Sequence, residues 1–393
     1  MPKQTIDDVD VRGKRALVRV DFNVPMDGGR ITDDTRIRAA LPTIQRLRQQ
    51  GAAVILVSHL GRPDGEVVEN LRLAPVAQHL SGLLGIAVAT APDCVGPEAE
   101  RAARDLPPGG VLLLENLRFH PEEEANDPAF AGQLAALADV YVNDAFGTAH
   151  RAHASTEGVA HILPAVAGLL MQREIEVMGR ALEQPERPFV AIVGGKKVSD
   201  KIGVLKNLIE KADRILVGGA MANTFFKAQG LQTGKSYVED EAVETAKDIL
   251  KRAQAAKKPL LLPMDCVAAT AFDAAAPHQV VPVDAIPADR AVLDIGPETV
   301  RQFKAVLDSA RTVIWNGPMG VFELEPFARG TQQVAAALTH VKGTTIVGGG
   351  DSVAALEQAG LAGDVTHVST GGGASLEFLE GRVLPGVAAL WDR

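Results

Sequence analysis

The sequence has few cysteines and few aromatic residues. Its 393 residues include two cysteines, Cys94 and Cys266, which lie far apart and form no CxxC pair. This usage excludes a disulfide framework and the common zinc-finger spacings, and it is typical of a reducing compartment. Aromatic residues make up 4% of the chain, yet 46% is apolar and 38 residues are glycine. The composition is therefore that of a folded globular protein and not of a disordered one.

Long apolar runs and an excess of basic residues are also missing. No run approaches the roughly 18 apolar residues of a membrane helix, and the first ten residues, MPKQTIDDVD, are polar. We therefore expect no signal peptide and no membrane association, and we expect a cytoplasmic protein. The 49 acidic and 40 basic side chains give a net charge of −9, which argues against a nucleic-acid-binding surface. An anion-binding site would need a local cluster of basic residues.

Short apolar runs alternate with amphipathic stretches along the chain. The runs, which have the length and β-branched content of buried strands, are 15–20, 52–57, 111–114, 140–142, 189–193, 214–217, 312–315 and 344–347. Helical spacing of apolar residues marks 35–50, 129–138, 199–212, 240–256, 299–309, 331–340 and 352–359. Strand–helix alternation predicts the α/β class with parallel sheets, and the length predicts two domains.

A charged stretch, 171–188, divides two halves of different character. It begins with a helical pattern and ends at two prolines, so we interpret it as a connecting helix and linker between domains 1–170 and 189–375. Arginines and histidines follow the strands of the first half, whereas glycines and lysines follow those of the second. The first half therefore suits a small anion and the second a nucleotide.

Basic side chains follow several strands of the first half, where ligands of open α/β sheets bind. They are Arg36, Arg62, Arg118, Arg151, His59 and His153, with Asp21 and Asn23 beside them as hydroxyl-binding candidates. Guanidinium groups pair bidentately with phosphate and carboxylate, so their convergence predicts a site for a multiply charged small anion. Alternatively, each arginine pairs with surface acids. A metal site at His150 and His153 is a weaker reading, because no cysteine or carboxylate partner is near.

Two glycine turns in the second half favour phosphate binding. Gly194 to Lys201 follows a strand and opens a helix, and Lys197 and Lys201 add positive charge. The alternative is an ordinary turn before a lysine-bearing helix. Gly348 to Ser352 repeats the design with Asp351 in the first helical turn, where a carboxylate beside phosphate is useful if Mg²⁺ lies between them. The alternative role of Asp351 is a helix N-cap.

Other glycine-rich segments carry less information. A third glycine turn, at 369–375, also precedes a helix, but three consecutive glycines alone are weak evidence. The segment 230–236, GLQTGKS, resembles a P-loop but has three residues between its glycines where that motif has four, and it follows a helix. No G-x-G-x-x-G fingerprint occurs, which argues against a dinucleotide site.

Nine segments in this order and spacing closely resemble the phosphoglycerate kinase family. They are DFNVP (21–25), SHLGRP (58–63), ENLRF (115–119), FGTAHRAHAS (146–155), GGKKVSDK (194–201), GGAMANTF (219–226), NGPMGVFE (316–323), GGGDS (348–352) and STGGGAS (369–375). The resemblance implies two doubly wound, Rossmann-like parallel-sheet domains that face each other across a cleft and are joined by a helix. It also implies that 376–393 returns to the first domain.

The resemblance further assigns residues to ligands. It implies that 3-phosphoglycerate binds to Asp21, Asn23, Arg36, His59, Arg62, Arg118 and Arg151. It implies that the nucleotide, ATP or ADP, binds to Lys201, Gly218, Gly219, Glu323, Gly349, Gly350, Asp351 and Ser352, with Asp351 holding Mg²⁺. The catalytic groups would be Arg36, nearest the reacting carboxyl, with Lys197, Lys201 and the amides around Gly372. Family likeness also implies a monomer.

The implied reaction is reversible phosphoryl transfer between ATP and the carboxyl group of 3-phosphoglycerate, giving 1,3-bisphosphoglycerate. A carboxylate acceptor is already ionised at neutral pH, so no general base is needed, and catalysis rests on positioning and charge neutralisation after domain closure about 171–188. Lys196 and Val292 depart from the family pattern, which usually has a small residue and a glycine there. Two rival classes are a solute receptor, disfavoured by the polar start, and a nicotinamide-dependent dehydrogenase, disfavoured by the missing fingerprint.

Overall fold

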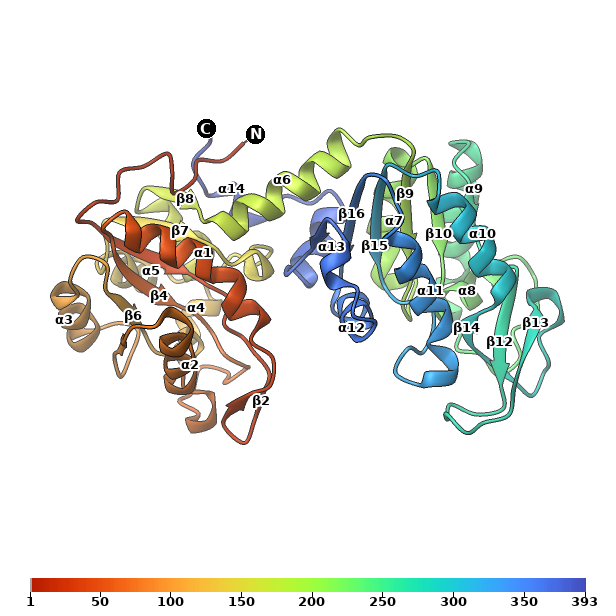
Figure 1. The fold of residues 1–393 in the computed structure, drawn as a ribbon, viewed down its shortest axis with the longest axis horizontal. Coiled ribbons are helices and arrows are strands. Elements are labelled where there is room, and N and C mark those ends of the chain that lie inside the picture. The colour runs from red at the N-terminus through yellow and green to blue at the C-terminus, as the bar shows by residue number, and fades with distance from the viewer. Residues whose placement is uncertain (1) are drawn as a thin grey trace. The chain divides into compact units, whose positions relative to one another are not determined.

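The structure is a computed structural model that describes residues 2–393 (Figure 1). The chain divides into two compact units, residues 1–176 with 383–393, and residues 177–382. The chain passes from the first unit to the second within helix α6 (Leu169–Glu183). It returns at Val383, later than the residue 376 expected from the sequence, because residues 376–382 belong to the second unit.

A six-stranded parallel sheet forms the centre of the first unit. Its order is β5 (Val88–Thr90), β6 (Val111–Leu113), β4 (Ala53–Val57), β1 (Arg15–Arg19), β7 (Val140–Asn143) and β8 (Ala165–Ala167). The chain moves from β1 to β4 and to the edge strand β5, places β6 between β4 and β5, and then returns to the other side of β1 with β7. The strand order therefore reverses beside β1, and the carboxyl ends of strands at such a reversal frame a ligand-binding crevice.

The helices of the first unit cover a buried aliphatic core. They are α1 (Thr35–Gln49), α2 (Ala74–Leu84), α3 (Pro97–Asp105), α4 (Pro121–Glu124), α5 (Pro128–Ala135) and, from the returning segment, α14 (Pro385–Ala388). In α1 the side chains of Ile37, Ala40, Ile44 and Leu47 are buried, at the three- and four-residue spacing that places them on one helix face. A two-stranded hairpin, β2 (Met26–Asp27) and β3 (Arg30–Ile31), follows β1.

The second unit contains another six-stranded parallel sheet. Its order is β11 (Leu260–Leu261), β10 (Arg214–Val217), β9 (Phe189–Val193), β15 (Thr312–Asn316), β16 (Thr344–Gly348) and β17 (His367–Val368). The helices are α7 (Ile202–Lys211), α8 (Met221–Ala228), α9 (Val243–Ala255), α10 (Pro297–Leu307), α11 (Arg329–Leu338), α12 (Gly350–Gln358) and α13 (Gly373–Leu379). The strand order reverses between β9 and β15, which makes the loops after these two strands the expected ligand site.

The second unit also has a three-stranded antiparallel sheet that the sequence did not lead us to expect. Its order is β13 (His278–Pro282), β12 (Asp265–Ala269) and β14 (Ala291–Ile295). Most residues of β13 are exposed, and a strand of this kind does not need the continuous apolar run that marks the buried strands of the parallel sheets. The two large sheets nevertheless confirm the predicted fold class of two α/β domains.

Candidate active site

The first unit gathers arginines around one buried histidine. His59 follows β4 and is 4% exposed, and its Nδ1 lies 3.2 Å from a guanidinium nitrogen of Arg19. Burial lowers the pKa of His59 well below its usual range, and the charges of Arg19, Arg118, Arg36 and Arg151 lower that pKa further. His59 is therefore neutral at pH 7, and the four arginines create a strongly positive local potential.

Arg36 is fixed by the loop that follows β1. It lies in the first turn of α1, and its Nη1 donates to Asp21 Oδ2 at 3.1 Å and to the Asn23 carbonyl at 3.0 Å. The Asn23 side-chain oxygen accepts from the Gly61 N–H at 2.9 Å, which joins this loop to the one after β4. Asp21, Asn23 and Arg36 therefore form one hydrogen-bonded group.

Arg118 is the most enclosed of the predicted anion-binding arginines. It lies in the short helix 117–119 after β6, is 5% exposed, and donates from Nη1 to the Gly61 carbonyl at 2.9 Å. Burial lowers its pKa, and the nearby charge of Arg151 adds to that effect. Such a group is stabilised when an anion binds, because the anion replaces lost hydration. Arg62 is exposed on the loop that also holds Gly61.

Arg19 was missed in the sequence because it lies within an apolar run. It is 1% exposed on β1, and its Nε donates to Ser155 Oγ at 2.8 Å. Ser155 Oγ in turn donates to the buried Glu123 at 2.5 Å. Burial raises the pKa of Glu123, although the charge of Arg19 opposes that rise. The signal that could have identified Arg19 was the position of a charged residue within an apolar, strand-like run. A charged side chain is buried there only if hydrogen-bonding or ionic partners compensate it.

His153, the other histidine of the predicted cluster, lies near the same charges. Burial lowers its pKa to about 4, and the charges of Arg19, Arg118 and Arg151 act in the same direction. Its Nδ1 lies 3.9 Å from Glu123 Oε1. His153 is thus uncharged at pH 7 and lies near several arginine charges, and its role in anion contact or structural bonding stays a prediction.

In the second unit, the loops after β9, β10 and β15 approach so closely that glycine is required. Gly219 has φ +70°, and a Cβ there would lie 2.5 Å from the Gly195 carbonyl oxygen. The Gly195 N–H donates to the Pro318 carbonyl and the Gly219 N–H to the Met319 carbonyl. At Gly218 a Cβ would meet the sulfur of Met319 at 2.5 Å. Gly195 and Pro318 line two adjoining cavities, and Gly219 and Met319 line the larger of the two.

The larger cavity has a volume of about 620 Å³ and is mainly apolar in its lining side chains. Predicted nucleotide residues in its wall are Gly219, Glu323 and Asp351. Val292 on β14 also lines it, so the antiparallel sheet supplies one wall. The size and lining suit a planar aromatic base with a polar sugar at the rim.

The smaller cavity has a volume of about 460 Å³ and is framed by two glycine loops. Its lining includes Gly194, Lys197, Lys201 and the segment Gly349–Ser352. Gly195, Lys196, Pro318 and Asp351 line both cavities. The arrangement therefore continues from an apolar compartment into one with lysine charge and helix-end amides, as a nucleotide with its phosphates requires.

Lys201 carries its charge into a largely buried position in the smaller cavity. Its Nζ donates to the side-chain oxygen of Asn316, the last residue of β15. Burial lowers the pKa of Lys201, while the carboxylates of Asp200, Asp351 and Glu380 oppose that change. Because burial disfavours the charged form, a phosphate ligand, which adds a further negative charge, would stabilise this ammonium.

The start of α12 presents a carboxylate to both cavities. Gly349, with φ +92°, is the N-cap residue, so Asp351 lies in the first turn and the N-cap alternative for it is wrong. Ser352 is buried and its Oγ accepts from the Gly317 N–H at 2.5 Å. The exposed Asp351 carboxylate is an oxygen ligand of the kind that Mg²⁺ prefers. Gly372 opens α13 with φ +49°, and among the described residues it lines neither of these two cavities.

Lys235 and Tyr237 in the larger cavity were not assigned a role from the sequence, whereas Lys196 was already noted as a departure from the family pattern. Lys235, in the segment rejected as a P-loop, lines the wall although no helix starts there. The Lys196 ammonium lies 4.8 Å from the ring centroid of Tyr237, a cation–π contact between two lining residues. No local pattern marks these positions, because the loop that carries Lys235 and Tyr237 is irregular.

Comparison with known proteins identifies the family. The phosphoglycerate kinase family profile matches residues 6–382. Curated relatives named phosphoglycerate kinase include those of Moorella thermoacetica and Pelotomaculum thermopropionicum, 64% and 58% identical over 393 residues, with 100% of both chains covered. This chain belongs to the phosphoglycerate kinase family.

Solved structures of phosphoglycerate kinases share the fold described above. The structure from Coxiella burnetii has a TM-score of 0.91 and 42% identity, covering 99% of this chain and 98% of that chain. The structure from Pyrococcus horikoshii OT3 has a TM-score of 0.87 and 35% identity, covering 98% of each. The chain is therefore a kinase with the phosphoglycerate kinase fold. Among its described residues, no helix is long and apolar enough to cross a membrane.

Proposed function

We propose that the arginine cluster of the first unit binds 3-phosphoglycerate and that the two cavities of the second unit bind ATP or ADP. Phosphoryl transfer between them then interconverts 3-phosphoglycerate and 1,3-bisphosphoglycerate, as in glycolysis. The observation that carries the acceptor assignment is the convergence of Arg19, Arg36, Arg118 and Arg151 on the neutral His59. A trianionic ligand fits this potential, since phosphate and carboxylate each pair with guanidinium groups.

The nucleotide assignment rests on the continuity of the two cavities. The base would occupy the larger one beside Val292 and Gly219, and Glu323 at its rim would contact the ribose. The phosphates would lie against Lys201, the first-turn amides of α12 and Ser352. Gly218 supports the base compartment through Met319.

The residues of this site fit a divalent cation at Asp351. The exposed Asp351 residue lines both cavities, and its charge opposes the lowering of the Lys201 pKa by burial. Bound Mg²⁺ would be held by Asp351 and the phosphates, and it would neutralise phosphate charge. The remaining charge is met by Lys197, Lys201 and Arg36, with the amide at Gly372 as a further donor.

Catalysis by this set is positioning together with electrostatic stabilisation. The attacking carboxylate of 3-phosphoglycerate is ionised at pH 7, so no side chain has to remove a proton. His59 and His153, both uncharged, serve as hydrogen-bonding groups in this account. Because the acceptor and donor sites belong to different units, the units have to bring the ligands together, which we assign to a domain closure. We further propose that the enzyme is a cytoplasmic monomer.

Calorimetric titration of matched variants tests the two half-sites separately. Arg118→Ala is expected to weaken 3-phosphoglycerate binding by about 100-fold, because a buried charge-assisted pair is lost, while Mg-ADP binding stays unchanged. Asp351→Ala is expected to weaken Mg-ADP binding and to leave 3-phosphoglycerate binding unchanged. A variant that alters both titrations equally, in protein with an unchanged melting curve, would overturn the assignment of separate sites.

A further inference from the structure

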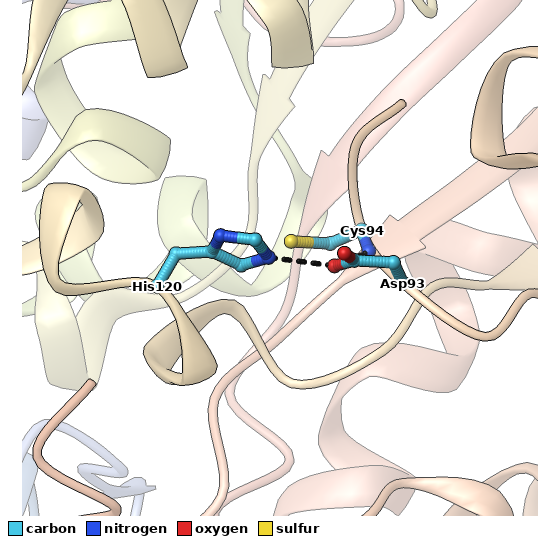
Figure 2. A group of neighbouring side chains, drawn as sticks. All are labelled: Asp93, Cys94 and His120. Carbon is cyan, nitrogen blue, oxygen red and sulfur yellow. Dashed lines mark hydrogen bonds and ion pairs between the residues drawn. The ribbon is translucent and has the colours of Figure 1, made fainter. Parts of the chain in front are cut away.

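A cluster of three potential metal ligands lies in the first unit, outside the ligand sites described above. Asp93 and Cys94 belong to the loop between β5 and α3, and His120 precedes α4. One ligand atom from each side chain lies within 4.8 Å of the other two. Figure 2 shows the three side chains converging, with the dashed line joining His120 to Asp93. The contact between His120 Nε2 and Asp93 Oδ1 is 2.6 Å.

The donor set is that of a thiolate-accepting cation. Thiolate, imidazole and carboxylate together are typical ligands of Zn²⁺, whereas Mg²⁺ and Ca²⁺ prefer oxygen alone. Cys94 is fully buried, while the Asp93 side chain is 46% exposed. The cluster thus has one enclosed soft ligand and an opening to solvent, through which an ion could enter and a water could complete four ligands.

The surroundings orient the ligands. The imidazole of His120 packs against Phe130, with the ring centroids 5.2 Å apart. The Cys94 N–H donates to Asp93 Oδ1 at 2.6 Å, which holds the carboxylate beside the thiol. Roughly 2.0–2.3 Å separates Zn²⁺ from each ligand atom, so tetrahedral ligand atoms are roughly 3.3–3.8 Å apart. The ligand atoms, all within 4.8 Å of one another, are therefore close to the separations that one ion requires.

The same three residue types could instead suggest a cysteine nucleophile, but the geometry argues against it. A nucleophilic cysteine has to be accessible and readily ionised. Cys94 is inaccessible, and burial raises the pKa of its thiol, with the neighbouring Asp93 charge adding to that rise. In addition, the histidine nitrogen is directed to the carboxylate.

We propose that Asp93, Cys94 and His120 form a binding site for Zn²⁺ or a similar thiolate-binding divalent cation. Binding replaces the S–H bond of Cys94 and the hydrogen bond between His120 and Asp93 with bonds to the ion, and the displaced protons pass to solvent. The ion ties the loop after β5 to the start of α4. His120 is two residues beyond Arg118, so an occupied site also braces the short helix that carries this arginine.

Cobalt absorbance on the full-length enzyme tests the proposal. Co²⁺ bound by a thiolate gives a near-ultraviolet charge-transfer band, which a site of oxygen and nitrogen ligands does not give. We expect one equivalent of Co²⁺ to develop this band in reduced, chelator-treated enzyme, and excess Zn²⁺ to abolish it. Cys94→Ser is expected to remove the band, and Asp93→Asn to weaken Co²⁺ affinity at least 10-fold.

The second cysteine provides a matched control. Cys266 is also buried, and Cys266→Ser is expected to retain the full band. His120→Asn, at a partly exposed position, repeats the test in case Cys94→Ser does not fold, and is expected to reduce Co²⁺ affinity at least 10-fold. No charge-transfer band in the wild type, a band that persists in folded Cys94→Ser, or an unchanged Co²⁺ affinity in His120→Asn would overturn the proposal.

Thermal unfolding gives an independent readout. Zn²⁺ at 100 times its Kd is expected to raise the Tm of the first unit by roughly 5–10 °C, since a ligand that binds the folded state stabilises it. The shift should be absent in folded His120→Asn. An equal shift in wild type and His120→Asn would assign the stabilisation to another site and contradict the proposal.

Discussion

Lys201→Met separates catalysis from stability in the phosphate compartment. The substitution keeps the length of the side chain and removes a largely buried ammonium that contacts Asn316. In the proposed mechanism this group neutralises charge that develops on the transferred phosphoryl group. Loss of one such donor lowers kcat by about 100- to 1000-fold, which corresponds to about 2.7–4 kcal/mol.

The pKa shift of Lys201 gives the opposite expectation for the free energy of unfolding. The folded-state pKa is lower than the unfolded value of 10.5, because burial disfavours the charged form. Below the folded-state pKa, burial of the charged ammonium therefore reduces the free energy of unfolding. This destabilisation disappears as the pH rises from the folded-state pKa to the unfolded value of 10.5. Methionine removes it, so the ligand-free variant should be at least as stable as the wild type at pH 7.

Steady-state assays and chemical denaturation measure the two effects side by side. Lys206→Met is the matched control, because Lys206 is an exposed residue of the adjoining helix α7 and should change neither quantity. A Lys201→Met enzyme that keeps more than a tenth of the wild-type kcat would refute the assigned role. A clear decrease in the free energy of unfolding of Lys201→Met, with or without loss of activity, would refute the argument that burial of this ammonium destabilises the ligand-free protein.

Three further predictions concern residues that support the sites. Arg19→Met should reduce the free energy of unfolding by about 2–4 kcal/mol, because it leaves buried hydrogen-bonding partners unsatisfied, and it should raise the KM for 3-phosphoglycerate. Arg15 on the same strand pairs with Asp139 at the surface, so Arg15→Met should change neither quantity when denaturation and kinetics are measured. Burial raises the pKa of Asp144 to about 7, above its unfolded value of 3.8, so the free energy of unfolding falls as the pH rises from 3.8 to about 7. Relative to wild type, the free energy of unfolding of Asp144→Asn, measured with urea, should therefore increase by about 2–3 kcal/mol between pH 5 and pH 8. A wild-type-like pH slope in that variant would contradict the shift. Lys196→Ala should weaken Mg-ADP binding about 3- to 10-fold in calorimetry, because it removes a cation beside the proposed phosphate position, and should not change 3-phosphoglycerate binding. Unchanged ADP affinity would mean that the contact between Lys196 and Tyr237 is structural only.

The parts of the fold and site that the sequence predicted share a physical cause. Buried parallel strands need continuous apolar runs, and their ligand-binding ends are marked by an abrupt change to polar residues or glycine. Asp21, His59 and Arg118 stand out for this reason, and so do the glycine loops after β9 and β16. Strand–helix alternation predicts parallel strands, which place these carboxyl ends at one edge of each sheet, but it does not predict the strand order.

The parts that were missed depend on tertiary partners. Arg19 looks like an outward-facing residue of a strand, and its burial is possible because Ser155 and His59, distant in sequence, satisfy its guanidinium. The exposed strand β13 lacks an apolar run, whereas the short apolar runs of β12 and β14, the strand that carries Val292, were not recognised as strands of a separate antiparallel sheet. Asp93 and Cys94 are neighbours in one loop, whereas His120 lies in another loop 26 residues after Cys94, so no common motif spacing links the three.

The most direct test of the account is a coupled assay for ATP-dependent formation of 1,3-bisphosphoglycerate from 3-phosphoglycerate, run with Mg²⁺ on wild type and Arg36→Ala. We predict activity in the wild type and a kcat at least about 100-fold lower in the variant, because Arg36 neutralises charge at the reacting carboxyl. Folded wild-type enzyme that binds both ligands and forms no product would contradict the proposed reaction. An Arg36→Ala enzyme with wild-type kcat would contradict catalysis by charge neutralisation at this position.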